Sequence, residues 1–214
     1  MFYSIAKALS FLIFKLTGGI EIYGAERLPK KGPLIIVSNH QSLIDPFVLV
    51  TCIPMRIVFF AAAYLFKIPV VRQVLTWGGA IPVHGEKGDF GSFKKALEVL
   101  QKGGVIGLFP EGGVSPDGNL RPFMQGWAYL AAKSGAQVLP VAIRGSRNVL
   151  PVGSFILRRG RITLNIGEVM TFSGQGKVSR EDMAKMNEKL DKEFKQLFSA
   201  QFNGRIFNGA SKSI

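Results

Sequence analysis

The fold is decided by the stretch LIIVSNHQSLID, residues 34–45. Its first five residues form an apolar run after Gly32-Pro33, which predicts a buried strand in a sheet that is covered on both faces. The following residues, NHQSLID, predict a loop at the end of this strand. Asp45-Pro46 then predicts the start of a helix, because proline is favoured at the first helical position. A buried strand, a polar loop and a helix in this order are typical of an α/β fold.

Strands and helices alternate along the rest of the chain. Short apolar segments predict further strands at 20–24, 77–83, 105–109, 137–143 and 161–166, and a strand followed by a helix within 56–66. Helices are predicted at 2–16, at 92–102 with Ser92 as the cap, at 124–134, and from a capping box at Ser179 and Asp182 through about residue 197. We therefore expect an α/β fold with a mostly parallel central sheet flanked by helices, and a site in loops beyond the carboxyl ends of its strands.

The composition suits one globular domain that works on an anionic partner. The chain has 214 residues, and its single cysteine, Cys52, excludes an internal disulfide. The formal net charge is +13, which fits nucleic acid, an anionic membrane face or a phosphate-bearing donor. A mean hydropathy of +0.23 and seventeen phenylalanines against four tyrosines favour lipid over nucleic acid, because phenylalanine has no polar group to place in a wet interface.

The first residues predict a helix in the membrane interface. The segment FYSIAKALSFLIFKL, residues 2–16, is too short and carries too many lysines to cross a bilayer, which needs about 20 apolar residues. Lys7 and Lys15 fall on roughly one helical face, so we expect an amphipathic, membrane-associating helix at 1–17. The alternative is an ordinary helix packed on the domain. We expect the main domain at 18–202 and a flexible tail, rich in Gly, Ser and Asn, at 203–214.

His40, one of only two histidines, is a candidate general base. A histidine at a strand end can accept a proton, and a carboxylate five residues later, Asp45, can hold the imidazole by its other nitrogen. Taken alone the pattern is open to another interpretation. Asp45 before Pro46 also fits a plain helix N-cap, and His40 also fits a turn histidine.

The segment FPEGGVS, residues 109–115, is a second candidate site loop. Glu111 stands at a strand end, and the glycines Gly112 and Gly113 permit the backbone to approach a ligand closely. The alternative is a glycine-rich turn after an edge strand.

Taken together, these segments resemble the glycerolipid (lysophospholipid) acyltransferase family. That family carries N-H-x-x-x-x-D, then F-P-E-G-T-R-S, then an apolar block with a central proline. The corresponding segments here are 39–45, 109–115 and Val-Leu-Pro-Val at 138–141, and the resemblance spans about 34–145. The resemblance implies that His40 deprotonates an acceptor hydroxyl while Asp45 orients the imidazole. The hydroxyl would then attack a thioester directly, without an acyl-enzyme.

The resemblance also implies the partners of the site. Acyl-CoA or acyl-carrier protein would be the co-substrate, with no cofactor and no metal, and lysophosphatidic acid would be the acceptor that becomes phosphatidic acid. Glu111, Gly112 and Gly113 would lie near the glycerol-phosphate end of the acceptor. Independently of the resemblance, the charge, the composition and the helix at 1–17 lead us to expect a peripheral or monotopic protein on an anionic membrane surface, at the cytoplasmic face, that binds no nucleic acid.

The chain departs from the family where the acceptor phosphate is expected. Val114 stands where the family's F-P-E-G-T-R-S block has arginine, and His84 stands where another family block ends in arginine. A histidine cannot hold phosphate with a bidentate fork as arginine does. Either a cation from another loop substitutes, or the acceptor is a different lysophospholipid or a lipid alcohol. The candidate cations, besides His84 itself, are Arg144 at the end of the strand 137–143, then Arg121 and Lys87.

Simpler interpretations of these residues remain open. His84 also fits a solvent-exposed position, and Arg144 also fits a structural ion pair. For the whole chain, the competing classes are a non-enzymatic basic protein that coats membrane or nucleic acid, and a metal-dependent hydrolase. The second has few possible ligands, since the chain has two histidines and no tight carboxylate cluster.

Overall fold

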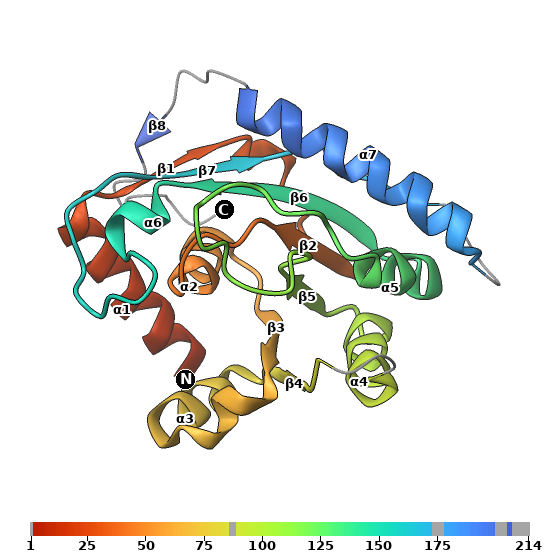
Figure 1. Ribbon diagram of the computed structural model, residues 1–214, viewed down its shortest axis with the longest axis horizontal. Helices are drawn as coiled ribbons and strands as arrows, with labels where there is room; N and C mark the ends of the chain where they lie inside the picture. The colour runs from red at the N-terminus through yellow and green to blue at the C-terminus, as the bar shows by residue number, and fades with distance from the viewer. Residues whose placement is uncertain (1, 86–88, 173–177, 200–204, 207–214) are drawn as a thin grey trace.

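The computed structural model describes residues 2–85, 89–172, 178–199 and 205–206, and within them the chain forms a single eight-stranded sheet (Figure 1). The strand order is β4-β3-β5-β2-β6-β7-β1-β8. All neighbouring pairs are parallel except β6 with β7 and β1 with β8. The strands are β1 (Ile20–Tyr23), β2 (Leu34–Ser38), β3 (Ile57–Ala62), β4 (Ile81–Val83), β5 (Val105–Leu108), β6 (Gln137–Arg144), β7 (Ile162–Ile166) and β8 (Arg205–Ile206). The prediction of a mostly parallel α/β sheet is confirmed.

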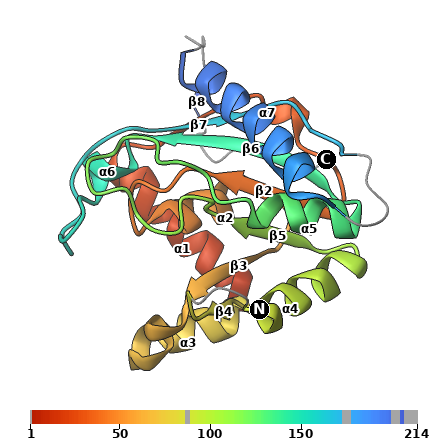
Figure 2. The ribbon, with the colours of Figure 1, turned by 45° about the vertical axis from the view of Figure 1, so that its right-hand side comes forward.

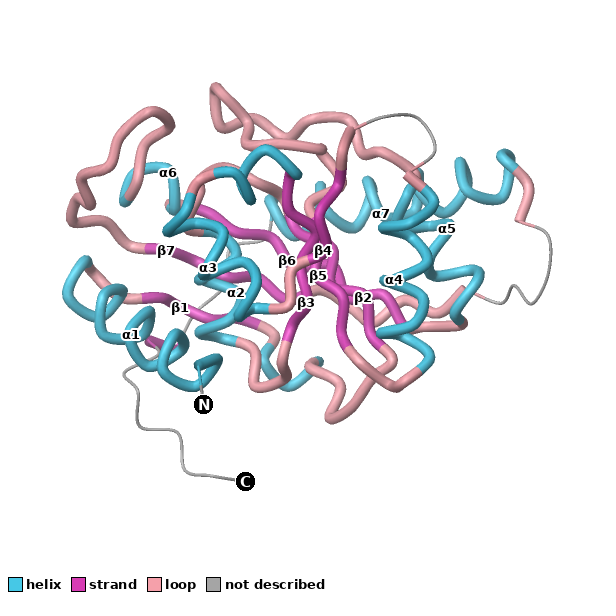
Figure 3. Tube along the Cα trace, turned by 90° about the horizontal axis from the view of Figure 1, so that it is seen from below, coloured by secondary structure: helices cyan, strands magenta, loops and turns pink. Residues whose placement is uncertain are grey.

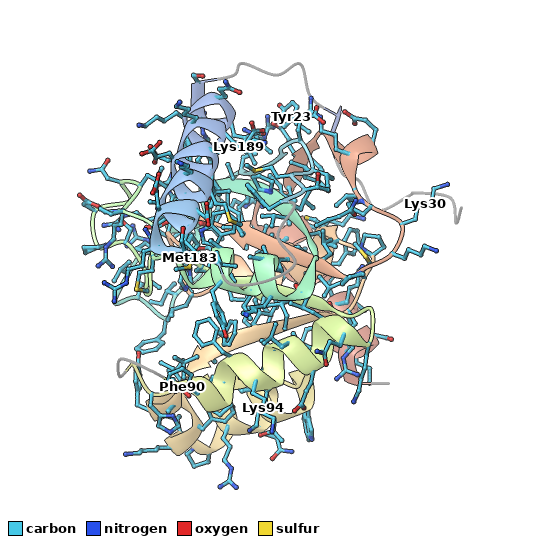
Figure 4. All side chains as sticks on the ribbon, turned by 90° about the vertical axis from the view of Figure 1, so that its right-hand side faces the viewer. Tyr23, Lys30, Phe90, Lys94, Met183 and Lys189 are labelled. Atoms are coloured by element: carbon cyan, nitrogen blue, oxygen red, sulfur yellow. The ribbon has the colours of Figure 1, made fainter. Side chains whose placement is uncertain are left out.

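Helices cover both faces of the sheet, and Figure 3 shows the sheet between them, with α1 and α2 on one side and α4, α5 and α7 on the other. Side chains alternate along each strand, so Leu34 and Ile36 pack with Phe14 of α1 and Leu49 of α2. Ile35 enters the other core, under the helices that face the viewer in Figure 4. The helices are α1 (Phe2–Thr17), α2 (Asp45–Cys52), α3 (Pro69–Gly78), α4 (Phe90–Gln101), α5 (Gly126–Ser134), α6 (Ser146–Val149) and α7 (Arg180–Ser199), with 3-10 turns at Ala25–Arg27 and Ala63–Lys67.

Two local predictions are wrong. The segment 77–83 is a strand only from Ile81, because α3 begins at Pro69 and runs through Gly78 before Gly79 turns the chain with a φ of 76°. Helix α4 is capped by Asp89 rather than Ser92, since the Asp89 carboxylate accepts from the Ser92 backbone N–H at 3.2 Å. The Ser92 hydroxyl instead donates to the carbonyl of Pro82. The capping box of α7 is confirmed, because Ser179 Oγ accepts from the Asp182 N–H at 3.0 Å.

Helix α1 packs on the domain with the side that carries Lys7. Lys7 Nζ donates to the Ile53 carbonyl at 2.9 Å, and burial lowers its pKa. Tyr3 donates to the Met55 carbonyl, and Ser10 and Phe14 are buried on the same side. The opposite side exposes a stripe of apolar side chains, the α1 stripe: Ile5, Leu9, Leu12 and Leu16. The helix at 2–16 is confirmed, but Lys7 does not share an exposed face with Lys15.

Two further predictions concern the ends of the chain. Among the described residues no helix combines the length and hydropathy needed to cross a membrane. The predicted tail at 203–214 lies outside the described residues, apart from the two-residue strand β8 that pairs antiparallel with β1.

Candidate active site

The candidate site is built where three neighbouring parallel strands end. Strand β2 lies between β5 and β6 and is parallel to both, with Val37 level with Leu108 and with Pro140. The loops that follow β2 and β5 therefore leave the sheet at the same edge. These are the two loops that the sequence analysis singled out, at 39–45 and 109–115, and the carboxyl edge of a parallel sheet is where α/β sites form.

His40 and Asp45 form a hydrogen-bonded pair in the first loop. His40 Nδ1 lies 2.9 Å from Asp45 Oδ2, the Asp45 side chain is fully buried, and the His40 side chain is 14% exposed. A carboxylate only accepts hydrogen bonds, so the neutral imidazole carries its proton on Nδ1. The lone pair is then on Nε2, which is the nitrogen left to accept a proton from a ligand.

Asp45 holds the loop rather than the helix that follows it. Its Oδ2 also accepts from the backbone N–H groups of Gln41, at 2.7 Å, and Ser42, at 2.8 Å. The N-cap of α2 is Ile44, and no side chain caps this helix. The interpretation of Asp45 as a plain N-cap is therefore wrong. Asp45 Oδ1 is buried and has no hydrogen-bond partner within the described part of the chain.

The second loop forms hydrogen bonds with the backbone N–H and carbonyl of His40. Glu111 Oε1 accepts from the His40 N–H at 2.9 Å, Glu111 Oε2 accepts from the Arg121 N–H at 3.3 Å, and the Ser115 N–H donates to the His40 carbonyl at 2.7 Å. Burial raises the pKa of Glu111, and the two N–H groups partly offset this effect. Both oxygens of Glu111 thus face backbone donors, so this carboxylate positions the loops.

Several residues of the site carried no assigned role in the sequence. The amide of Asn39 donates to the Ile143 carbonyl and accepts from the Ile143 N–H, at 2.9 and 2.7 Å, so it extends the pairing of β2 with β6. The ring of Phe109 stacks on the imidazole of His40 with centroids 4.0 Å apart. Arg147 donates to the Ser115 carbonyl at 3.1 Å. Asn39 and Phe109 lie inside the quoted motifs, but no sequence signal pointed to Arg147.

Arg121 lies beside the glycine pair of the second loop. A Cβ atom on Gly113 would be 3.9 Å from Arg121 Nη1 and would meet nothing closer. Gly112 adopts a φ of +73°, and a Cβ there would collide with the tip of Met124. The exposed Arg121 side chain therefore lies near the backbone of Gly113, with no other described side chain closer to that glycine. The same loop carries Glu111, whose carboxylate accepts from the His40 N–H.

Two of the other predicted cations, Arg144 and His84, lie away from this glycine pair. The Arg144 guanidinium lies 4.9 Å from the ring centroid of Phe198, on α7, and its Nε is buried without a hydrogen-bond partner in the described structure. His84 follows the edge strand β4, and its side chain is 65% exposed. The His84 N–H donates to Asp89, and this bond is the main cause of an Asp89 pKa lowered to about 2. Lys87 lies outside the described residues.

This geometry defines an α/β protein with a histidine that is oriented by a buried aspartate at the carboxyl edge of the sheet, an arrangement that suits a general base. The sequence model of the acyltransferase family matches residues 19–144, and the chain belongs to this family. The recognition of an acyltransferase from its sequence blocks is thus confirmed.

Individual relatives extend the comparison. A chloroplast 1-acyl-sn-glycerol-3-phosphate acyltransferase of Arabidopsis thaliana is 31% identical over 80% of this chain, and the match covers 49% of that relative. The 1-acyl-sn-glycerol-3-phosphate acyltransferase of Bacillus subtilis is 28% identical over 87% of this chain and 92% of its own length. The crystal structure of the 1-acyl-sn-glycerophosphate acyltransferase of Thermotoga maritima superimposes with a TM-score of 0.76 and 27% identity, over 94% of this chain and 81% of that one. The chain spans about half the length of the plant relative.

Proposed function

We propose that the protein transfers a fatty acyl group from the thioester of acyl-CoA or acyl-carrier protein to the free hydroxyl of lysophosphatidic acid, which gives phosphatidic acid. The observation that carries the proposal is the His40–Asp45 pair at 2.9 Å, with Nε2 of the imidazole left for a ligand. Support also comes from relatives named for this acceptor in a plant and in two bacteria.

The chemistry requires one base and no protein nucleophile. His40 Nε2 takes the proton of the acceptor hydroxyl as its oxygen attacks the thioester carbonyl carbon. The C–S bond then breaks, the ester forms, and the imidazolium returns its proton to the departing thiolate. The buried carboxylate of Asp45 stabilises the imidazolium between these steps. In this proposal no cofactor and no metal take part, and the lone thiol of Cys52, with a pKa raised to about 12 by burial, has no role.

Arg121 is the proposed cation for the acceptor phosphate. Arg121→Ala is expected to raise KM for lysophosphatidic acid by roughly 10–100-fold, since a charge-assisted hydrogen bond contributes about 1.5–3 kcal/mol. The value of kcat should change little if only uniform binding is lost. Arg144→Ala is the matched control, because its guanidinium lies against Phe198 rather than beside the glycine pair.

An acceptor panel decides between the two acceptor classes. Both donors are supplied with lysophosphatidic acid, with lysolipids of capped phosphate and with a lipid alcohol, and initial rates are compared for wild type and Arg121→Ala. The missing family arginines, replaced by Val114 and His84, favour the second candidate function, acylation of a larger lysophospholipid or of a lipid alcohol. A wild-type preference for those acceptors, with lysophosphatidic acid kinetics unaffected in Arg121→Ala, would refute the phosphate-monoester proposal.

The protein also binds membranes through the α1 stripe, as part of the same proposal. Leu9 and Leu12 are 57% and 51% exposed, on the side of α1 opposite to its contacts with the domain. Leu9→Gln with Leu12→Gln is expected to lower sedimentation with anionic vesicles by about ten-fold or more, since these apolar side chains gain most from leaving water. High salt should weaken wild-type binding without abolishing it. Unchanged sedimentation of the double variant would place the membrane contact on another surface.

A further inference from the structure

The connection between α6 and β7 carries several exposed apolar side chains that have no role in the proposed function. This apolar loop, residues 151–159, reads PVGSFILRR. Phe155 is 96% exposed and Ile156 is 75% exposed, and Val152 and Leu157 are 49% and 41% exposed. In Figures 1 and 2 the loop, drawn in cyan, projects from the body of the molecule beyond α6. Burying a single large apolar side chain is favourable, so a run of this kind marks a contact surface.

The loop is held in shape by its own hydrogen bonds. The Arg158 N–H donates to the Val149 carbonyl at 2.8 Å and closes its base. Ser154 Oγ accepts from the Ile156 N–H at 3.1 Å, and the Ser154 N–H donates to the Pro151 carbonyl at 3.0 Å. The tip that carries Phe155 and Ile156 is therefore presented outward by a structured turn, and little further ordering is needed when it binds.

Both ends of the loop are tied to surfaces already described. At one end, the hydroxyl of Ser42, in the loop of His40, donates to the Leu150 carbonyl at 2.7 Å. At the other end, the Gly160 N–H donates to the carbonyl of Thr17, the last residue of α1, at 2.7 Å. The neighbouring Leu43 is itself 57% exposed. The apolar loop thus adjoins the C-terminal end of α1 at one end and the loop of His40 at the other.

The basic residues beside the tip indicate an anionic lipid surface as the partner of the loop. Arg158 and Arg159 are exposed and form no ion pair with any residue in the described part of the chain. Arginine binds phosphate through its fork of N–H donors, and apolar side chains next to basic ones suit the boundary between lipid headgroups and acyl chains.

A second copy of the chain fits this surface poorly. In a two-fold dimer the same patch meets itself, so the arginines of one copy would approach those of the other. A specific interface also buries about 800 Å² on each partner, more than the tip of one projecting loop offers.

We propose that the apolar loop inserts Phe155 and Ile156 into the headgroup region of an anionic phospholipid bilayer, with Arg158 and Arg159 on lipid phosphates, and so seats the mouth of the His40 site against the membrane. The inference rests on the proposed lipid-directed function. It adds to the α1 stripe a second contact, which is joined to the catalytic loop through Ser42.

The insertion is measured with a fluorescent label on the full-length chain. Phe155→Cys carries an environment-sensitive nitrobenzoxadiazole label, and Gln196→Cys is the matched control, because Gln196 is exposed on α7 at the opposite face of the sheet. Unmodified protein corrects for labelling of the buried Cys52. Vesicles of phosphatidylcholine with phosphatidylglycerol should shift the emission of the label at 155 to the blue and brighten it. The label at 196 should not respond.

Two outcomes of this measurement overturn the proposal. One is a label at 155 that stays as in water in the presence of vesicles, whether or not the protein sediments with them. The other is a blue shift without vesicles that grows with protein concentration, which would assign the loop to contacts between copies of the chain.

Activity tests the link to the site. Phe155→Ser with Ile156→Ser is expected to lower affinity for anionic vesicles, and the rate on vesicle-borne lysophosphatidic acid, by about ten-fold or more. The rate on a short-chain lysophosphatidic acid, dissolved below its micelle concentration, should be unchanged. Equal losses on both acceptors would overturn the proposal, because the loop would then act on the catalytic loop and not on the membrane. If the wild type acylates neither acceptor, the proposed function fails, while the fluorescence result still decides whether the loop inserts.

Discussion

His40→Ala is expected to lower kcat/KM for acyl transfer by roughly 10²–10⁴-fold, the usual contribution of a positioned general base. Nδ1 of the imidazole is bonded to Asp45 at 2.9 Å, so Nε2 is the atom that can take the proton of the acceptor hydroxyl. The measurement is the initial rate of acylation of lysophosphatidic acid with each donor. The fold should persist, because the Glu111 and Ser115 contacts are made by the backbone of His40.

The other histidine provides the control for this substitution. His84 has a side chain that is 65% exposed, and the removal of its imidazole in His84→Ala should leave the rate near that of wild type. Vesicle sedimentation by His40→Ala should also be unchanged, because the α1 stripe and the apolar loop are intact. If His40→Ala keeps more than about a tenth of the wild-type rate, His40 is not the base. The competing interpretation, a basic protein that only coats membranes, would then gain weight.

Asp45→Asn is expected to lower kcat by up to roughly 10⁴-fold, as when the orienting carboxylate of a Ser-His-Asp triad becomes an amide. The amide oxygen can replace Oδ2 as the acceptor of the Gln41 and Ser42 N–H groups, so the loop should keep its shape. The negative charge that stabilises the imidazolium is lost. The amide N–H₂ then takes the place of the buried, unpartnered Oδ1, which should cost about 1–3 kcal/mol of unfolding free energy.

Asp89→Asn is the control for Asp45→Asn, because it also replaces a carboxylate by an amide but at a helix cap. Asp89 caps α4 by accepting from Ser92, and asparagine caps a helix about as well as aspartate. We expect near-full activity for Asp89→Asn and a crippled Asp45→Asn, with urea unfolding measured for both. An Asp45→Asn variant with near-full kcat would show that Asp45 serves only as an acceptor for the loop.

Local sequence was sufficient to place the strand, the loop and the helix at 34–52 and to mark His40 and Asp45 as candidates. Their expected roles came from the resemblance of three separate segments to the acyltransferase family. These two residues are five apart, and the tight loop between them lets the chain bring them together without help from distant segments. The capping box of α7 is equally local, and it was also predicted correctly. The cap of α4 was assigned to Ser92 instead of Asp89, because both residue types cap helices. Only the structure shows that the Asp89 carboxylate accepts from the Ser92 N–H, while the Ser92 hydroxyl donates to the Pro82 carbonyl.

What the sequence by itself determined about this protein is the α/β class, the order of its elements and the pairing of His40 with Asp45, because these depend on the period of apolar residues and on neighbours along the chain. The tertiary structure decided that Arg121 rather than Arg144 stands beside the glycine pair, that Glu111 holds the His40 backbone, and that Lys7 faces the domain. These contacts join distant segments: Glu111 is 71 residues from His40, and Ser42 is 108 residues from Leu150. These contacts depend on which loops the strand order of the sheet brings to the same edge. The period of apolar residues along the chain does not specify that strand order.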